Sequence, residues 1–338
     1  HNIPEALSLT GALNPTAMGT AVQDLVDRHA VLRTVFPEEH GRPTQRVLSP
    51  SSARVEMERH TVDQDTLDVA LSRAAREPFD LTVEPPLRVH LYTLSPNEHV
   101  LLLLLHHIAG DGWSFRPLMN DLVTSYNARS NGSVPETPEL PVEYSDYALW
   151  QREVMEAPEG PARAQMEFWR ATLDGAPATV TPPTDRTRPD VPSHRGGTVQ
   201  FSLPADLHAE LLETARDRGA TLFMVLHTAL CALLTRVGAG TDITVGTPVA
   251  GRSDPILDSL VGFFVNTLPL RVDTSNNPTL AELLDRVRSA DLEAYSHQDV
   301  PFERLVSELS PERRTDQAPF YQVLLALNNT PTAEAEPH

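Results

Sequence analysis

The apolar positions of the chain predict alternating strands and helices. Arg88–Leu94 places apolar side chains at every second residue, whereas Val100–Leu105 is a continuous apolar run, typical of a strand covered on both faces. Ser95–Asn97 between them has the composition of a turn, so the two strands are predicted to form a hairpin. Apolar residues spaced three and four apart predict helices at Asp65–Arg76 and Arg116–Asn127.

The same patterns continue along the rest of the chain and predict an α/β fold with mixed sheets. Further helices are predicted at Asp146–Glu156, Pro161–Leu173, Ala205–Arg218, Thr221–Val237 and Leu280–Tyr295, and further strands at Val31–Phe36, Thr198–Leu203, Asp242–Pro248, Phe263–Val272 and Tyr321–Asn328. A proline-rich segment, Asp174–Gly197, separates two such series. We therefore expect two lobes, residues 1–174 and 175–338.

Composition and charge exclude several classes of function. The chain has 338 residues, with 27 Lys and Arg against 46 Asp and Glu, a net charge of −19 that repels nucleic-acid phosphates. No apolar run approaches the roughly 20 residues of a membrane helix, so no membrane partner is predicted. The single Cys231 cannot form an internal disulfide, which favours a reducing, cytoplasmic compartment.

The candidate chemistry lies in LLLLLHHIAGDGWSF, where the apolar strand runs into two histidines. Successive side chains on a strand point to opposite faces, so His106 and His107 cannot aim at one point while the strand stays regular. This argues against a metal held by both rings. No second cluster with metal-ligand spacing is visible, and we predict no metal site.

Gly110–Gly112 is predicted to turn the chain back beyond the strand. Asp111 in this turn can point back and hold the histidine site through a hydrogen bond or an ion pair. In an equally open alternative, His106 packs in the core, His107 caps the strand, and Asp111 caps a helix that starts near Ser114.

These residues form the pattern HHxxxDG, which resembles the signature of nonribosomal peptide synthetase condensation domains, in the superfamily of chloramphenicol acetyltransferase. Five further segments resemble motifs of that family, in the same order: RHAVLRTVF, YSDYALWQ, GTPVAGR, VGFFVNTLPLR and HQDVPFERLV. The family's first motif is absent and the family normally continues beyond Asn329, so we expect the chain to be incomplete at both ends. The tail TPTAEAEPH has few apolar residues and is expected to be disordered.

The resemblance implies two acetyltransferase-like lobes that form a V-shaped pseudo-dimer around a central tunnel. The family joins an upstream acyl or peptidyl thioester to the α-amine of a downstream aminoacyl thioester. Upstream and downstream carrier proteins deliver both substrates on 4′-phosphopantetheine arms, and no intrinsic cofactor is implied. An adjacent adenylation domain is an expected partner, and the product class includes antibiotics and siderophores.

The resemblance also assigns roles to residues of this chain. His107 becomes the central residue, either a base or a positioner of the amine, with His106 beside it. The backbone amide of Gly112 is placed to stabilise an oxyanion. Asp111 resembles a residue that pairs with an arginine, and Arg33 and Arg271 are the candidates. Residues expected to line or brace the tunnel are Trp113, Ser114 and, from the second lobe, Asn266.

Three alternatives remain within the same fold. Epimerisation domains share HHxxxDG, although VNTLPLR favours condensation; dual condensation–epimerisation domains carry an extra histidine motif in a region this chain lacks. A non-catalytic domain that only recruits partner proteins is the third. Cyclisation domains are excluded by the two histidines. NIPEALSLTG and HHIAGDGWS resemble domains with a D-configured donor somewhat more than those with an L-configured donor.

Overall fold

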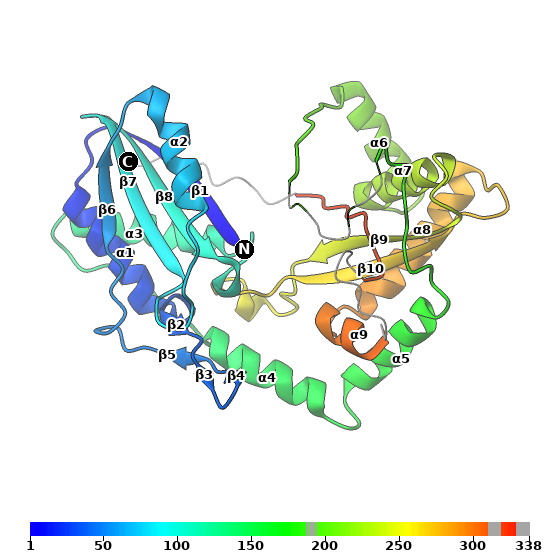
Figure 1. Ribbon diagram of the computed structural model, residues 1–338, viewed down its shortest axis with the longest axis horizontal. Coiled ribbons are helices and arrows are strands. Elements are labelled where there is room, and N and C mark those ends of the chain that lie inside the picture. Colours follow the sequence, from blue (N-terminus) through cyan, green and yellow to red (C-terminus); the bar gives the residue numbers. More distant parts are fainter. Residues whose placement is uncertain (187–188, 190–192, 194, 310–318, 329–338) are drawn as a thin grey trace. The chain divides into compact units, whose positions relative to one another are not determined.

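The computed structural model describes residues 1–186, 189, 193, 195–309 and 319–328 (Figure 1). Two compact units divide the chain. His1–Arg152 and Arg252–Phe264 belong to the first unit, and Glu153–Gly251 and Val265–Asn329 to the second. The division falls inside helix α4 (Tyr144–Glu156) rather than at residue 174. The observed division differs from the expected one in a second way: residues 252–264, expected in the second lobe, belong to the first unit.

The first unit contains a four-stranded mixed sheet in the order β1-β8-β7-β6 (Figure 1). The strands are β1 (Asn2–Thr10), β8 (Glu98–His106), β7 (Leu87–Ser95) and β6 (Met57–Thr61). β8 pairs antiparallel with both β1 and β7, which confirms the predicted hairpin, whereas β6 pairs parallel to β7. β8 is therefore a central strand and β6 lies at an edge.

Helices cover both faces of this sheet. Leu101, Leu103 and Leu105 of β8 are fully buried with helices α1 (Pro15–Arg28) and α3 (Phe115–Ser130). Leu102 and Tyr92 point to the opposite face and pack with Leu67 of helix α2 (Gln64–Ala75). The continuous apolar sequence of β8 is explained by burial of every side chain, as the sequence predicted.

Short elements complete the first unit. The predicted strand at Val31–Phe36 is reduced to β2, because a 3₁₀ turn occupies the residues before it. These elements are η1 (Ala30–Arg33), β2 (Thr34–Val35), β3 (Glu38–Glu39), β4 (Arg42–Pro43), β5 (Arg46–Val47), η2 (His107–Ala109) and η3 (Pro255–Leu257). β2 pairs with β5 and β3 with β4.

The second unit is built on one antiparallel strand pair and five helices among its described residues. The strands are β9 (Asp242–Val249) and β10 (Asn266–Asp273), and the helices are α5 (Pro161–Leu173), α6 (Ala205–Asp217), α7 (Leu222–Arg236), α8 (Leu280–Ser296) and α9 (Phe302–Leu309). Ile243, Val245 and Val272 pack with α7 and α8 in one cluster, while Leu268 and Leu270 pack with Trp169 in another. Leu270 and Val272 lie two residues apart on β10, so the two clusters adjoin each other along the same face of the strand pair.

Two predicted strands of the second unit are wrong. Thr198–Leu203 alternates in sequence but is irregular, and Val199 and Phe201 are exposed, because an alternating segment becomes a strand only beside a partner strand. Tyr321–Asn328 forms only a parallel bridge between Leu324 and Gly246. The described residues of the proline-rich segment 174–197 form neither helix nor strand, as expected for a linker. The tail expected to be disordered lies outside the described residues.

Among the described residues, no single helix is long and apolar enough to cross a membrane. Helices α6 and α7 meet the length and composition criteria only as a pair, and they are bent by 103° at the break between them.

A fully buried histidine–carboxylate pair joins α7 to α8. The Nδ1 atom of His227 lies 3.0 Å from the nearer carboxylate oxygen of Asp291, and neither side chain is exposed. Burial by itself lowers the pKa of His227, but interactions with Asp291 and Cys231 outweigh it and raise the pKa to about 9. At neutral pH the pair is therefore an ion pair in the core.

This pair predicts that stability falls at alkaline pH. The pKa of His227 is about 9 in the folded chain, against about 6.5 when unfolded. The ion pair therefore stabilises fully below about pH 6.5 and loses its contribution, at most about 3 kcal/mol, as the pH rises through the folded value. Urea unfolding between about pH 6.5 and pH 9 should show the free energy of unfolding falling as the pH rises. The fall is expected in wild type and in the control His208→Gln, which alters an exposed histidine. His227→Gln combined with Asp291→Asn should abolish the fall; a fall that persists contradicts the assignment.

Candidate active site

The histidine pair stands where the central strand ends. β8 ends at His106, and His107 begins the 3₁₀ turn η2. The Nδ1 atom of His107 lies 2.9 Å from the carbonyl oxygen of Gly110. Because a carbonyl oxygen only accepts, Nδ1 carries the hydrogen and donates it. In the neutral ring this leaves the lone pair on Nε2, the nitrogen that can take a proton or hydrogen-bond an amine.

His106 has the opposite arrangement. Its Nδ1 accepts a hydrogen bond from the Ile108 N–H at 3.1 Å, so the neutral ring carries its hydrogen on Nε2. Burial lowers the pKa of His106, which favours the neutral ring. Its edge contacts are with Phe79 and His1, whereas the ring of His107 meets Phe263, at 4.9 Å between centroids. The two rings have different neighbours, as the strand alternation predicts.

Asp111 lies in the interior and binds two separate segments. It is 1% exposed. One carboxylate oxygen accepts hydrogen bonds from the N–H and the hydroxyl of Ser114, at 3.0 and 2.9 Å. The other accepts the N–H of Phe264 at 2.9 Å. Asp111 therefore closes its own turn and fastens a segment distant in sequence to that turn.

The cation beside Asp111 is Arg252. Its guanidinium lies 3.5 Å from the carboxylate, and the two side chains are 5% and 1% exposed. The guanidinium also donates to the carbonyl oxygens of Leu257 and Leu260 and stacks over the ring of Phe264, 4.2 Å from its centroid. A buried ion pair of this kind needs such additional hydrogen bonds to offset the loss of hydration.

The two arginines proposed from the sequence were the wrong partners. Arg33 donates to the carbonyl oxygen of Leu48 in the first unit. Arg271 belongs to the second unit, where it forms a bidentate pair with Asp242 at 2.9 and 2.7 Å. Arg271 stands opposite Thr244 on β9, two residues beyond Asp242, so its carboxylate partner comes from its own strand pair.

Ser114 is a structural residue rather than a lining residue. It is fully buried, and its hydroxyl lies 2.8 Å from the Gly262 carbonyl oxygen and 3.2 Å from the Gly262 N–H. Of the two roles predicted for Ser114, lining or bracing, its contacts fit bracing.

The side chain of Asn266, in the second unit, is hydrogen-bonded to the backbone of its own unit. Its amide donates to Gln298 and Val300 and accepts from Phe302, at 2.8–2.9 Å. The roles of Trp113, which is half-buried, and of Asn266 toward a tunnel stay predictions.

A tyrosine fixes the segment that carries Phe263. The hydroxyl of Tyr144 donates to the Phe263 carbonyl oxygen at 2.8 Å, and burial raises the pKa of this phenol above its usual range. A Cβ atom on Gly262 would stand 2.2 Å from the Tyr144 ring, so this position requires glycine. Tyr144 and Gly262 together set the position of the Phe263 ring against His107.

The two glycines of the turn differ in what they contribute. A Cβ on Gly110 would lie 2.4 Å from a methyl of buried Leu105, so only glycine lets the turn pass over the strand. A Cβ on Gly112 would meet no atom within 4 Å, and its φ is not left-handed. Neither the backbone conformation at position 112 nor its surroundings therefore require glycine. Gly110 is needed for close approach to the strand, whereas Gly112 has open space around it.

Sequence reasoning missed the residues that hold the turn in place: Arg252, Gly262, Phe263, Phe264 and Tyr144. A signal was present, because they fall in the segments GTPVAGR, VGFFVNTLPLR and YSDYALWQ that resemble family motifs. What the sequence did not show is that these three segments meet at one carboxylate.

A histidine pair at the end of the central strand and a buried Asp111–Arg252 pair beside its turn characterise this site. The family model described as condensation domain matches residues 1–338, and the chain belongs to the condensation domain family of nonribosomal peptide synthetases. Because the match spans the chain, the family applies to both units.

Relatives and solved structures agree with this family. The chain is 53% identical over 332 residues to the probable non-canonical nonribosomal peptide synthetase CymA of Salinispora arenicola, and 48% identical over 337 residues to a dimodular nonribosomal peptide synthase of Bacillus subtilis. These matches cover 97% and 99% of this chain but only 4% and 14% of the relatives. The X-domain from teicoplanin biosynthesis is similar in structure, with a TM-score of 0.90 and 35% sequence identity. The match covers 96% of this chain and 72% of the X-domain chain. The X-domain has also been solved in complex with OxyB.

The Asp111 network predicts a large loss of stability on neutralisation. Asp111→Asn should lower the free energy of unfolding by about 3 kcal/mol or more, because buried Arg252 loses its counter-charge. Adding Arg252→Met should recover part of that loss. Glu167→Gln, which alters an exposed pair with Arg163, should change stability by less than about 1 kcal/mol. Urea denaturation measures the free energy of unfolding of wild type and the three variants. An Asp111→Asn protein with the stability and turnover of wild type would contradict the structural role of Asp111.

The glycine pair offers a matched test of the turn. Gly110→Ala should destabilise by about 1–3 kcal/mol through its collision with Leu105, whereas Gly112→Ala should stay within about 0.5 kcal/mol of wild type. Thermal unfolding compares the two. If Gly112→Ala folds normally and turnover is unchanged, a close approach of substrate to this backbone is ruled out; a loss of turnover alone places substrate beside Gly112.

Proposed function

We propose that this domain catalyses amide bond formation between two thioester-bound substrates in nonribosomal peptide synthesis. The observation that carries the proposal is the hydrogen bond from His107 Nδ1 to Gly110, which leaves Nε2 as the basic nitrogen of the ring. The family match supports the same reaction class.

The reaction asks little of the protein. The α-amine nitrogen of the acceptor attacks the thioester carbon of the donor, a C–N bond forms, and the C–S bond breaks to release a thiol. The amine loses one proton, and the departing thiolate gains one. An α-amine titrates near roughly 8, so it needs only modest help to be neutral. His107 Nε2 either accepts that proton or holds the amine at the attack angle.

Asp111 acts as a positioning residue in this scheme. Its buried carboxylate is occupied by Ser114, Phe264 and Arg252, so it has no role in proton transfer to substrate. It fixes the turn whose carbonyl orients His107. The Gly112 N–H, on the exposed side of the same turn, is the proposed donor to the oxyanion that forms when the amine attacks.

Carrier proteins are the proposed partners. An upstream donor and a downstream acceptor carrier would each present a substrate on a 4′-phosphopantetheine arm, and an adenylation domain would load the acceptor. That both arms reach His107 through a tunnel stays a prediction of the family resemblance. The proposed location is the cytoplasm.

A second candidate, recruitment of another protein without catalysis, is favoured by one comparison. The solved structure at TM-score 0.90 is an X-domain that also forms a complex with OxyB. Against it stands an intact histidine turn in which the His107 ring is fixed by both Gly110 and Phe263. Epimerisation, alone or combined with condensation, is the remaining alternative, and it differs by exchange of an α-proton.

The test is a reconstituted condensation assay. Donor and acceptor substrates are loaded on separate carrier proteins, with both donor configurations, and product is followed by intact-protein mass spectrometry. His107→Ala should lower amide formation by about 10²-fold or more, and exposed-site control His208→Ala should not. His107→Asn retains a hydrogen-bonding side chain but no basic nitrogen, so near-normal turnover in it assigns positioning rather than proton transfer.

The other outcomes separate the alternatives. Wild type that exchanges the α-proton without forming amide is an epimerisation domain. Wild type that does neither but still binds a carrier or another partner supports recruitment. Equal turnover in wild type and His107→Ala would contradict a chemical role for the histidine turn.

A further inference from the structure

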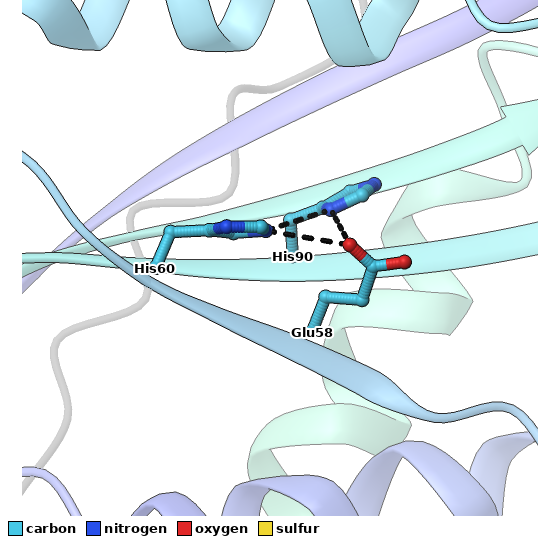
Figure 2. A group of neighbouring side chains, drawn as sticks. All are labelled: Glu58, His60 and His90. Atoms are coloured by element: carbon cyan, nitrogen blue, oxygen red, sulfur yellow. Dashed lines mark hydrogen bonds and ion pairs between the residues drawn. The ribbon is translucent and has the colours of Figure 1, made fainter.

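The face of the first unit's sheet that packs against α2 carries a second histidine cluster, away from the HHxxxDG turn. Glu58 and His60 lie two residues apart on edge strand β6, so their side chains share one face. His90 stands directly opposite Glu58 on β7. The three side chains point toward one another, as Figure 2 shows. Nothing in the proposed condensation reaction uses them.

The donor atoms of this cluster are spaced as the ligands of a tetrahedral metal ion. The Nε2 atom of His60 lies 3.3 Å from Nδ1 of His90 and 3.5 Å from a carboxylate oxygen of Glu58, and that oxygen lies 3.4 Å from Nδ1 of His90 (Figure 2). Zinc with bonds of roughly 2.0–2.1 Å to tetrahedral ligands holds its donor atoms about 3.3 Å apart. The three atoms therefore already form one face of such a tetrahedron.

The surroundings hold the ligands and leave room for a fourth. The ring of His60 stacks on Tyr92 at 4.9 Å between centroids, which restrains its orientation. His90 is 5% exposed and so has little freedom, whereas Glu58 and His60 are 61% and 37% exposed. The cluster borders a cavity of about 560 Å³ between the sheet and α2, into which a water can complete the coordination.

The charges around the cluster also suit a cation. Glu77 lines the same cavity and adds a second carboxylate, partly offset by Arg73. In the absence of metal, one hydrogen must be shared between the facing nitrogens of His60 and His90, and a metal ion replaces it with bonds to both.

We propose that Glu58, His60 and His90 bind a divalent transition-metal ion of the zinc class, with water as the fourth ligand. The ion would fasten β6, an edge strand with a free side, to its neighbour β7. Its role would be structural, because the open fourth position faces the α2 cavity and no HHxxxDG residue lines that cavity. This proposal does not depend on the proposed condensation activity.

The test is calorimetric titration of the intact chain with Zn²⁺ near neutral pH, after treatment with a chelator. Wild type should bind one equivalent, and His60→Gln should weaken that binding by about tenfold or more, because it removes one of three protein ligands. His208→Gln, at an exposed helical histidine, is the matched control and should bind as wild type does. Glu58→Gln provides a second ligand variant on the most exposed of the three side chains.

Two further readouts make the result decisive. Zn²⁺ should raise the thermal unfolding temperature of wild type and of His208→Gln but not of His60→Gln. Co²⁺ in place of zinc should give the intense visible absorption of a tetrahedral site. Binding that survives in His60→Gln places the metal elsewhere and overturns the proposal, as does a weak octahedral Co²⁺ spectrum in wild type.

Discussion

The buried carboxylate of Asp111 is the constraint on which the candidate active site depends. It accepts hydrogen bonds from the turn after β8 and from the backbone of Phe264, and it stands beside the guanidinium of Arg252. Such a carboxylate cannot be left without partners, because removing one member of a buried ion pair costs several kcal/mol. The need to satisfy it brings segment 252–264 back onto the first unit.

That returning segment shapes the surroundings of His107. Tyr144 and Gly262 fix the backbone at Phe263, and the Phe263 ring packs edge-on against the imidazole. The hydrogen bond to Gly110 fixes the other side of the ring. His107 is thus held by an aromatic contact and a backbone carbonyl, and both depend on the same polar network. Orientation of this kind is what a reaction governed by proximity requires.

The elements of the fold could largely be predicted, because their patterns are local. Val100–Leu105 is apolar at every position, and in the structure both of its faces are covered. Thr198–Leu203 failed because alternation does not reveal whether a neighbouring strand exists. β6 was missed because Met57–Thr61 carries charged residues on the face that becomes the Glu58–His60–His90 cluster.

The site could be predicted from the sequence only where its chemically active residues lie close together in the chain. HHxxxDG placed His107 and Asp111 correctly at one turn, since all its members lie within seven residues. The arginine that pairs with Asp111 could not be identified in this way. Arg33, Arg252 and Arg271 all lie in segments that resemble family motifs, and each follows an apolar or small residue, so their local sequences do not distinguish them. Ser114 was expected to line or brace a tunnel, and sequence alone could not show that its hydroxyl contacts the backbone of Gly262, 148 residues away.

The two histidine clusters of the first unit occupy mechanically different parts of one sheet. β8, which ends at His106, is paired along its whole length with β1 and β7, so its end is held from both sides. β6 pairs on one side only, over five residues from Met57 to Thr61. An edge strand leaves backbone N–H and C=O groups unpaired on its outer side. A metal ion bridging β6 to β7 would therefore reinforce a short strand that is paired on one side, while the strand that delivers His107 is already fixed by its two neighbours.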